Sequence, residues 1–195
     1  ERQGLNMNSI ARGDKLTAES WDDFVSRLHH DCVGAGVEQH YTADAIFIVQ
    51  ARRLIFGIDI DYTDRLTVIL EDKYWLTPME YWDDCGPENR GALDAAATEE
   101  SDGECNFADL SVADQWDLLG NLPDHTVTGW DDRWEYVCAH LTHDAANAFI
   151  DRKKHDYPEG LRVYVEAQIY CWEYNAIKDA ILDGRIVFQP PKGGD

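Results

Sequence analysis

The sequence is poor in basic residues. Lysine and arginine together number 17, against 38 aspartates and glutamates, so the formal net charge is −21 and the isoelectric point is near 4.4. A nucleic acid or an anionic membrane would be repelled by such a chain, which has no basic footprint for phosphates. We therefore expect no direct binding of nucleic acid.

Long apolar runs are also missing. No segment approaches the roughly 18 to 20 consecutive apolar residues that a membrane-spanning helix needs, and the sequence has no secretory signal pattern. The five cysteines are dispersed without a Cys-x-x-Cys pair, which is typical of reduced thiols and not of a disulfide framework. These absences predict a cytoplasmic protein with no membrane association.

Common catalytic signatures are absent as well. The chain has no phosphate-binding glycine loop, no Gly-x-Ser-x-Gly and no His-Glu-x-x-His. His29 and Cys32 are spaced for contact on a helix, but no third residue is placed to orient such a pair, so we assign Cys32 to core packing. We predict no catalytic residue and no cofactor, and a protein that is not an enzyme.

The composition that remains is that of a folded chain. Hydrophobic residues make up 44% of its 195 residues, with seven tryptophans and nine tyrosines, which excludes a disordered protein. Residues 1–6 precede Met7, and we interpret them as an expression remnant. The remaining chain is expected to form one globular domain, made of an acidic α+β region (7–125), a C-terminal hairpin–helix–strand–helix module (126–188) and a tail (189–195).

Local patterns predict an α+β fold with hairpins, an antiparallel sheet and several packed helices in a single compact unit, because helices and strands alternate without a βαβ rhythm. Cap residues predict helices starting at Ser20, Thr77, Pro87, Ser111, Thr142 and about Tyr170. Apolar patterns predict strands at 45–58, 66–70, 73–76 and 161–168, a hairpin of 127–130 with 134–141 turning at Asp131-Asp132, and an edge strand at 186–188.

The negative charge is concentrated in the middle of the chain. Residues 71–117 hold fourteen acids and two bases, a net charge of −12. Aromatic residues alternate with these acids, which indicates a folded segment with carboxylates on its outside. We predict a partner-binding acidic surface of Asp83, Asp84, Glu88, Asp94, Glu99, Glu100, Asp102 and Glu104. The expected aromatic anchors are Tyr74, Trp75, Tyr81 and Trp82.

Cys138, His140 and His143 form a candidate metal-ligand pattern. On a strand, Cys138 and His140 would share a face, and His143 would begin the next helix, so the three could converge on zinc. The alternative is that Cys138 and His140 pack inward while His143 lies at the surface. A metal-dependent enzyme that uses this region is therefore the second functional hypothesis.

The C-terminal third carries a resemblance. The residues concerned are Trp134-Glu135-Tyr136-Val137, the run from Leu141 to Ile150, His155, the run from Leu161 to Glu166 and the stretch 170–182. Across about 126–188 the chain resembles an uncharacterised module of bacteriophage, prophage and mobile-element proteins. The resemblance implies a genomic context and no reaction. Together with the acidity, it suggests an anti-defence protein of the anti-CRISPR or anti-restriction kind.

The first hypothesis is therefore an acidic phage or mobile-element inhibitor in the host bacterial cytoplasm. By protein–protein interaction it would bind a basic nucleic-acid-binding host protein, such as a restriction or CRISPR effector, with its carboxylates acting as a DNA mimic. An accessory or regulatory protein of the mobile element, which binds another protein of that element, is the other alternative. The sequence gives no oligomeric state.

Overall fold

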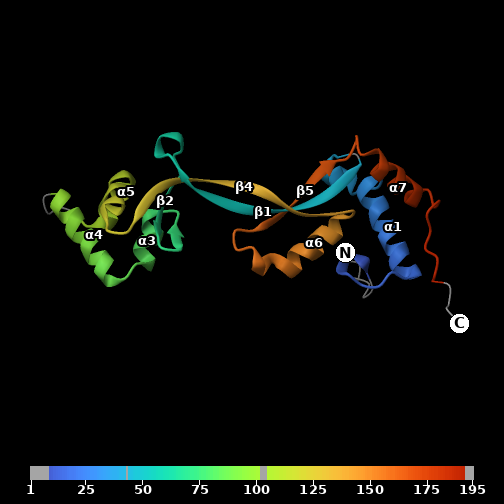
Figure 1. The fold of residues 1–195 in the computed structure, drawn as a ribbon, viewed down its shortest axis with the longest axis horizontal. Helices are drawn as coiled ribbons and strands as arrows, with labels where there is room; N and C mark the ends of the chain where they lie inside the picture. The colour runs from blue at the N-terminus through green and yellow to red at the C-terminus, as the bar shows by residue number, and fades with distance from the viewer. Residues whose placement is uncertain (1–8, 43, 102–104, 192–195) are drawn as a thin grey trace. The chain divides into compact units, whose positions relative to one another are not determined.

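The computed structural model describes residues 9–42, 44–101 and 105–191. It confirms the α+β class, with helices α1 to α7 and a five-stranded antiparallel sheet of strand order β3-β2-β4-β1-β5 in this part of the chain (Figure 1). In sequence order the strands are β1 (Ala45–Ile58), β2 (Leu66–Leu70), β3 (Lys73–Trp75), β4 (Thr126–His140) and β5 (Leu161–Ala167).

Residue contacts divide the chain into two compact units. The terminal unit comprises residues 1–53 and 134–195, and the acidic unit comprises residues 54–133. Both borders fall inside the long strands β1 and β4, whereas the sequence suggested a border near residue 126. A strand that runs through a border has no change in composition there, so the local pattern gives no indication of it.

In the terminal unit, one helix covers one face of the β1–β5 ladder. The two strands are antiparallel, with Phe47 opposite Val165. The helix α6 (His143–Lys153) begins at Thr142, whose side chain accepts a hydrogen bond from the Ala145 amide. Alternate β1 residues face this helix, and the buried core consists of Ala45, Phe47, Val49 and Ala146.

A second core of the terminal unit joins its other helices, α1 (Ala18–Cys32) and α7 (Trp172–Leu182), around Phe24, Leu28 and Ile181. We expected Ser20 to be the N-cap of the first helix, and this was wrong. Thr17 is the N-cap, and Ser20 is the N3 partner of its capping box. The short helices here are α2 (Val37–His40), η1 (Ile10–Arg12) and η4 (Lys154–Asp156).

In the acidic unit, three helices pack on a small antiparallel sheet. Strands β2 and β3 form the expected hairpin, with Val68 opposite Trp75, and β2 also pairs with β4. The helices are α3 (Pro78–Asp84), α4 (Pro87–Glu100) and α5 (Val112–Asn121), with the short η2 (Ile60–Tyr62) and η3 (Phe107–Asp109). The buried core consists of Val68, Tyr81, Leu93, Ala97, Phe107, Trp116, Leu118 and Leu119.

Two expected strands were wrong. The predicted hairpin 127–141 is one continuous strand, β4, and Asp131 and Asp132 do not form a turn, because Arg65 Nη1 binds both carboxylates, at 3.1 and 2.7 Å. Residues 186–188 are not a strand either. The amides of Arg185 and Ile186 both donate to the Ala180 carbonyl, which turns the chain back onto the end of α7.

Candidate binding surface of the acidic unit

The charge of the protein is divided unequally between the two units. The acidic unit holds twenty acids and four bases, a net charge of −16, and the terminal unit carries the remaining −5. The excess therefore belongs to one folded body of about 80 residues. All eight carboxylates of the predicted partner-binding set belong to this unit.

Local capping explains why acidic residues begin these helices. Thr77 caps α3, and Glu80 completes the capping box by accepting from the Thr77 amide at 3.2 Å. Ser111 caps α5 by accepting from the Asp114 amide. Carboxylates in a first helical turn also interact favourably with the helix dipole. Acidic residues thus stabilise the first turns of α3 and α5, and the outer faces of the helices remain available for further carboxylates.

Helix α4 carries three exposed carboxylates of this set. Its inward side chains are Leu93 and Ala97, which have no exposed surface. At about 100° per residue, Glu88 and Glu99 point to nearly the same side, opposite Ala97, and lie about 16 Å apart along the helix axis. Glu88, Glu99 and Glu100 are exposed and have no ion pair with any described residue. They are the strongest candidates for contact with a partner.

The carboxylates at the end of α3 are exposed as well. Asp84 accepts the Trp75 indole N–H at 3.2 Å and lies 3.7 Å from the Lys73 ammonium, so its charge is partly compensated. Asp83 is exposed, and its carbonyl accepts a hydrogen bond from Arg90. Asp102 and Glu104, which belong to the predicted set, lie outside the described residues.

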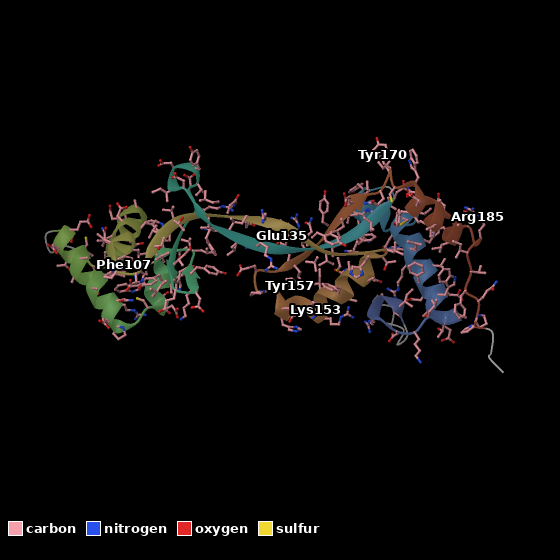
Figure 2. The ribbon with its side chains drawn as sticks, in the orientation of Figure 1. Phe107, Glu135, Lys153, Tyr157, Tyr170 and Arg185 are labelled. Atoms are coloured by element: carbon pink, nitrogen blue, oxygen red, sulfur yellow. The ribbon has the colours of Figure 1, made fainter. Side chains whose placement is uncertain are left out.

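Asp94, another member of the predicted set, has a structural role. It is only partly exposed, and its Oδ1 accepts the backbone N–H of Phe107 at 3.1 Å, where η3 begins. Phe107 is fully buried and is labelled in Figure 2 among the side chains between α3 and α4. The Asp94 carboxylate therefore stabilises the connection that follows α4, and its part in a contact surface stays a prediction.

Tyr81 is not a surface anchor, because its side chain has no exposed surface. Its hydroxyl donates to His125 Nε2 at 2.7 Å and accepts from the Asn89 amide at 2.8 Å, while His125 Nδ1 donates to the Pro123 carbonyl. Burial raises the pKa of the Tyr81 hydroxyl above its usual value. This residue holds α3, α4 and the segment before β4 together, and the aromatic–acid pattern gave no indication of its burial.

The other three predicted anchors are half-buried. Trp82 stacks on Phe107 with ring centroids 5.2 Å apart and an interplanar angle of 18°, and the Arg90 guanidinium lies 5.7 Å from its ring. Tyr74 packs against Phe56, with centroids 4.8 Å apart. Trp75 meets Tyr81 edge-on. These rings hold the unit together and leave only part of their surface for a partner.

The predicted metal ligands do not converge. Cys138 Sγ lies 3.2 Å from His140 Nε2, but the His143 ring packs against Phe47, with centroids 5.5 Å apart. Burial raises the pKa of the Cys138 thiol and lowers the pKa of His140, so both side chains are held neutral. In the described residues no group of three or more His, Cys, Asp or Glu side chains is placed to hold a metal ion.

A cavity of about 310 Å³ is the feature of the acidic unit that the charge pattern did not indicate. Its walls come from segments far apart in sequence: the start of β2, the connection from β3 into α3, the first turn of α5, and β4. Only tertiary packing brings these segments together. The lining residues are Asp64, Arg65, Leu66, Leu76, Thr77, Pro78, Met79, Val112, Gln115, Trp116 and Trp130.

None of the helices within the described ranges is long and apolar enough to cross a membrane. No protein-family model, curated protein or solved structure matches the chain.

Proposed function

We propose that this chain is an acidic binding protein that engages a basic, nucleic-acid-handling bacterial protein and blocks its access to nucleic acid. The observation that supports this most is the concentration of −16 in one folded unit of about 80 residues. A rigid body with such a charge resembles a nucleic acid in its field, and it steers onto the positively charged groove of a partner.

The exposed side of α4 is the proposed point of contact. Glu88, Glu99 and Glu100 have no compensating cation in the described chain and stand on a helix anchored by Leu93. These carboxylates are exposed to solvent and have no ion pair with a described residue. The lysines and arginines of a partner can therefore replace their counterions directly. On the resemblance to phage and mobile-element proteins that we infer from the sequence of the C-terminal third, we propose a host defence effector, of the restriction or CRISPR kind, as the partner.

The test compares two variants with equal changes of charge. In the acidic unit, E88Q/E99Q/E100Q removes three exposed carboxylates, and in the terminal unit E19Q/D22N/E38Q removes three others that are also exposed. Each immobilised protein is incubated with bacterial lysate at low salt and washed with rising salt, and retained proteins are identified by mass. A retained nucleic-acid-binding protein is then purified and titrated with a fluorescent DNA duplex in the presence of each variant.

We expect the wild type and the terminal-unit variant to retain the same partner and displace the duplex from it. The acidic-unit variant should bind about tenfold more weakly, because three exposed charge contacts contribute roughly 0.5 kcal/mol each. Equal affinity of the two variants would refute a role for the α4 carboxylates. A partner that still binds its duplex at saturating wild-type protein would refute blockage.

A further inference from the structure

The cavity of the acidic unit has an apolar interior. Among its lining residues, Trp116 and Pro78 are buried, whereas Met79 and Val112 are exposed, Val112 by 62%. Exposed aliphatic and thioether groups next to buried rings form a surface that accepts an apolar or long-stemmed side chain.

The rim of the cavity is negative. Asp64 is exposed and has no ion pair with any described residue. Arg65 is the cation of the rim, but Asp131 and Asp132 already bind its Nη1, and its guanidinium lies 5.1 Å from the Trp130 ring centroid. Asp131 and Asp132 thus compensate the charge of Arg65, and the charge of Asp64 is left over at the cavity, within a unit that adds further negative charge. This field attracts a cation and repels an anion.

Two helices begin at the cavity, and each carries a carboxylate in its first turn. In α3, Glu80 accepts a hydrogen bond from the Thr77 amide, and in α5 the Ser111 hydroxyl donates to Asp114 at 2.6 Å. These carboxylates repel a phosphate or an acidic peptide. The cavity therefore favours a ligand that is cationic at one end and apolar along its length.

We propose that this cavity receives an arginine side chain of the basic partner. The inference rests on the proposed function and deepens it, because it names the kind of side chain that fixes the acidic unit on its partner. The aliphatic part of arginine would pack on Met79 and Trp116, and its weakly hydrated guanidinium would pair with Asp64. Steering by the α4 carboxylates would bring the partner close, and this one buried contact would set its position.

The test uses Nα-acetyl-arginine amide as the probe and the ¹⁵N-labelled protein. The indole N–H groups of Trp116 and Trp130 report from the cavity, whereas that of Trp75, which is bound to Asp84, reports from elsewhere in the unit. Two variants on the same turn of α5 carry the same added charge. V112K places an ammonium at the cavity wall, and A113K places it on an exposed residue that does not line the cavity.

We expect a saturable shift of the Trp116 and Trp130 signals, a Trp75 signal that stays in place, and affinity lowered about tenfold by V112K but within about twofold by A113K. The corresponding leucine and glutamate amides should bind at least about tenfold more weakly than the arginine amide. Equal binding of the leucine or glutamate amide, or equal effects of the two lysine variants, would overturn the inference.

The failure of the inference and of the proposed function can be told apart. If V112K retains the captured partner as well as A113K does, while E88Q/E99Q/E100Q releases it, the cavity is not the anchor but the proposed function stands. If the arginine amide binds as expected but E88Q/E99Q/E100Q retains the partner as well as the wild type does, the proposed function fails, while binding of arginine in the cavity is supported.

Discussion

The terminal unit and the acidic unit differ most in how they treat their carboxylates. In the terminal unit, Arg27 binds Asp23 at 2.8 Å and Asp144, and Lys178 binds Asp44 at 2.5 Å. The acidic unit has only four bases, and Arg65 and Lys73 bind the carboxylates of Asp131, Asp132 and Asp84.

This unequal distribution of charge indicates that the acidic unit uses its carboxylates for more than solubility. Solubility requires only that the net charge lie away from zero, and it gives no reason for the excess to lie in one unit. Here a net charge of −16 lies in the smaller unit and −5 in the larger one. Several carboxylates of the terminal unit lie in ion pairs, whereas the acidic unit leaves those of α4 unpaired within the described chain.

The largest expected effect on the acidic unit alone is that of a substitution at Leu93. It is one of two fully buried residues on α4, so L93A leaves a cavity under the helix that carries the unpaired carboxylates. We expect the free energy of unfolding of the acidic unit to fall by about 3 kcal/mol. Hydrogen exchange of the α4 amides, resolved by mass spectrometry of peptides, measures this loss.

L28A is the matched control, because Leu28 is equally buried in the core of the terminal unit. It should accelerate exchange in α1 and leave exchange in α4 much less changed. If L93A and L28A accelerate exchange equally in α1 and α4, the two units unfold together and the charge of the acidic unit cannot be treated separately.

The sequence predicts the parts of the fold that depend on neighbouring residues. The Thr77–Glu80 capping box and the β2–β3 hairpin are confirmed, because the residues that form them lie within a few positions of one another. The continuous strand β4 was missed because Arg65, which binds Asp131 and Asp132, is about 66 positions away. A pair of aspartates is typical of a turn until a distant cation neutralises it.

The same limit applies to the candidate site. Exposure of Glu88 and Glu99 follows from helical spacing once Leu93 and Ala97 are taken as the inner face. The burial of Tyr81 does not follow from helical spacing. Helix α3 has only seven residues, and its inner face is determined by contact with His125, 44 positions away. The cavity lined by Met79 and Trp116 is likewise a product of packing alone.

Alkaline pH should act on the terminal unit. Burial raises the pKa of the Tyr174 hydroxyl, which donates to the Ala45 carbonyl at 2.6 Å. Burial alone would lower the pKa of Lys178, but its hydrogen bonds to Asp44 and Asp179 outweigh this and raise it. Both groups hold their protons more tightly in the folded state, so the stability they contribute is complete below the unfolded pKa values, near 10, and is lost as pH rises.

We expect K178M to lower the free energy of unfolding by about 2 kcal/mol near neutral pH, since it leaves Asp44 without its cation. The double variant Y174F/K178M should also show a shallower fall in stability between about pH 9.5 and pH 11. Urea unfolding at a series of pH values measures both effects. K154M removes an exposed lysine paired with Asp151 and serves as the control. A wild-type slope in the double variant would contradict the assignment.

The smallest expected effect is that of salt, which tests whether unpaired carboxylates destabilise the acidic unit more than the terminal unit. Carboxylates without cations repel one another, and this repulsion weakens as the Debye length falls from about 10 Å at 0.1 M to roughly 4 to 5 Å at 0.5 M ionic strength. We expect sodium chloride over this range to stabilise the acidic unit by about 0.5 to 1 kcal/mol, seen as slower exchange of the α4 amides, and the ion-paired terminal unit by less. The E88Q/E99Q/E100Q variant should lose part of this gain, because the charges that repel are among those removed. If salt stabilises both units equally, or stabilises the variant as much as the wild type, the carboxylates of α4 do not destabilise the acidic unit. Their exposure would then carry no stability cost that binding to a basic partner could relieve.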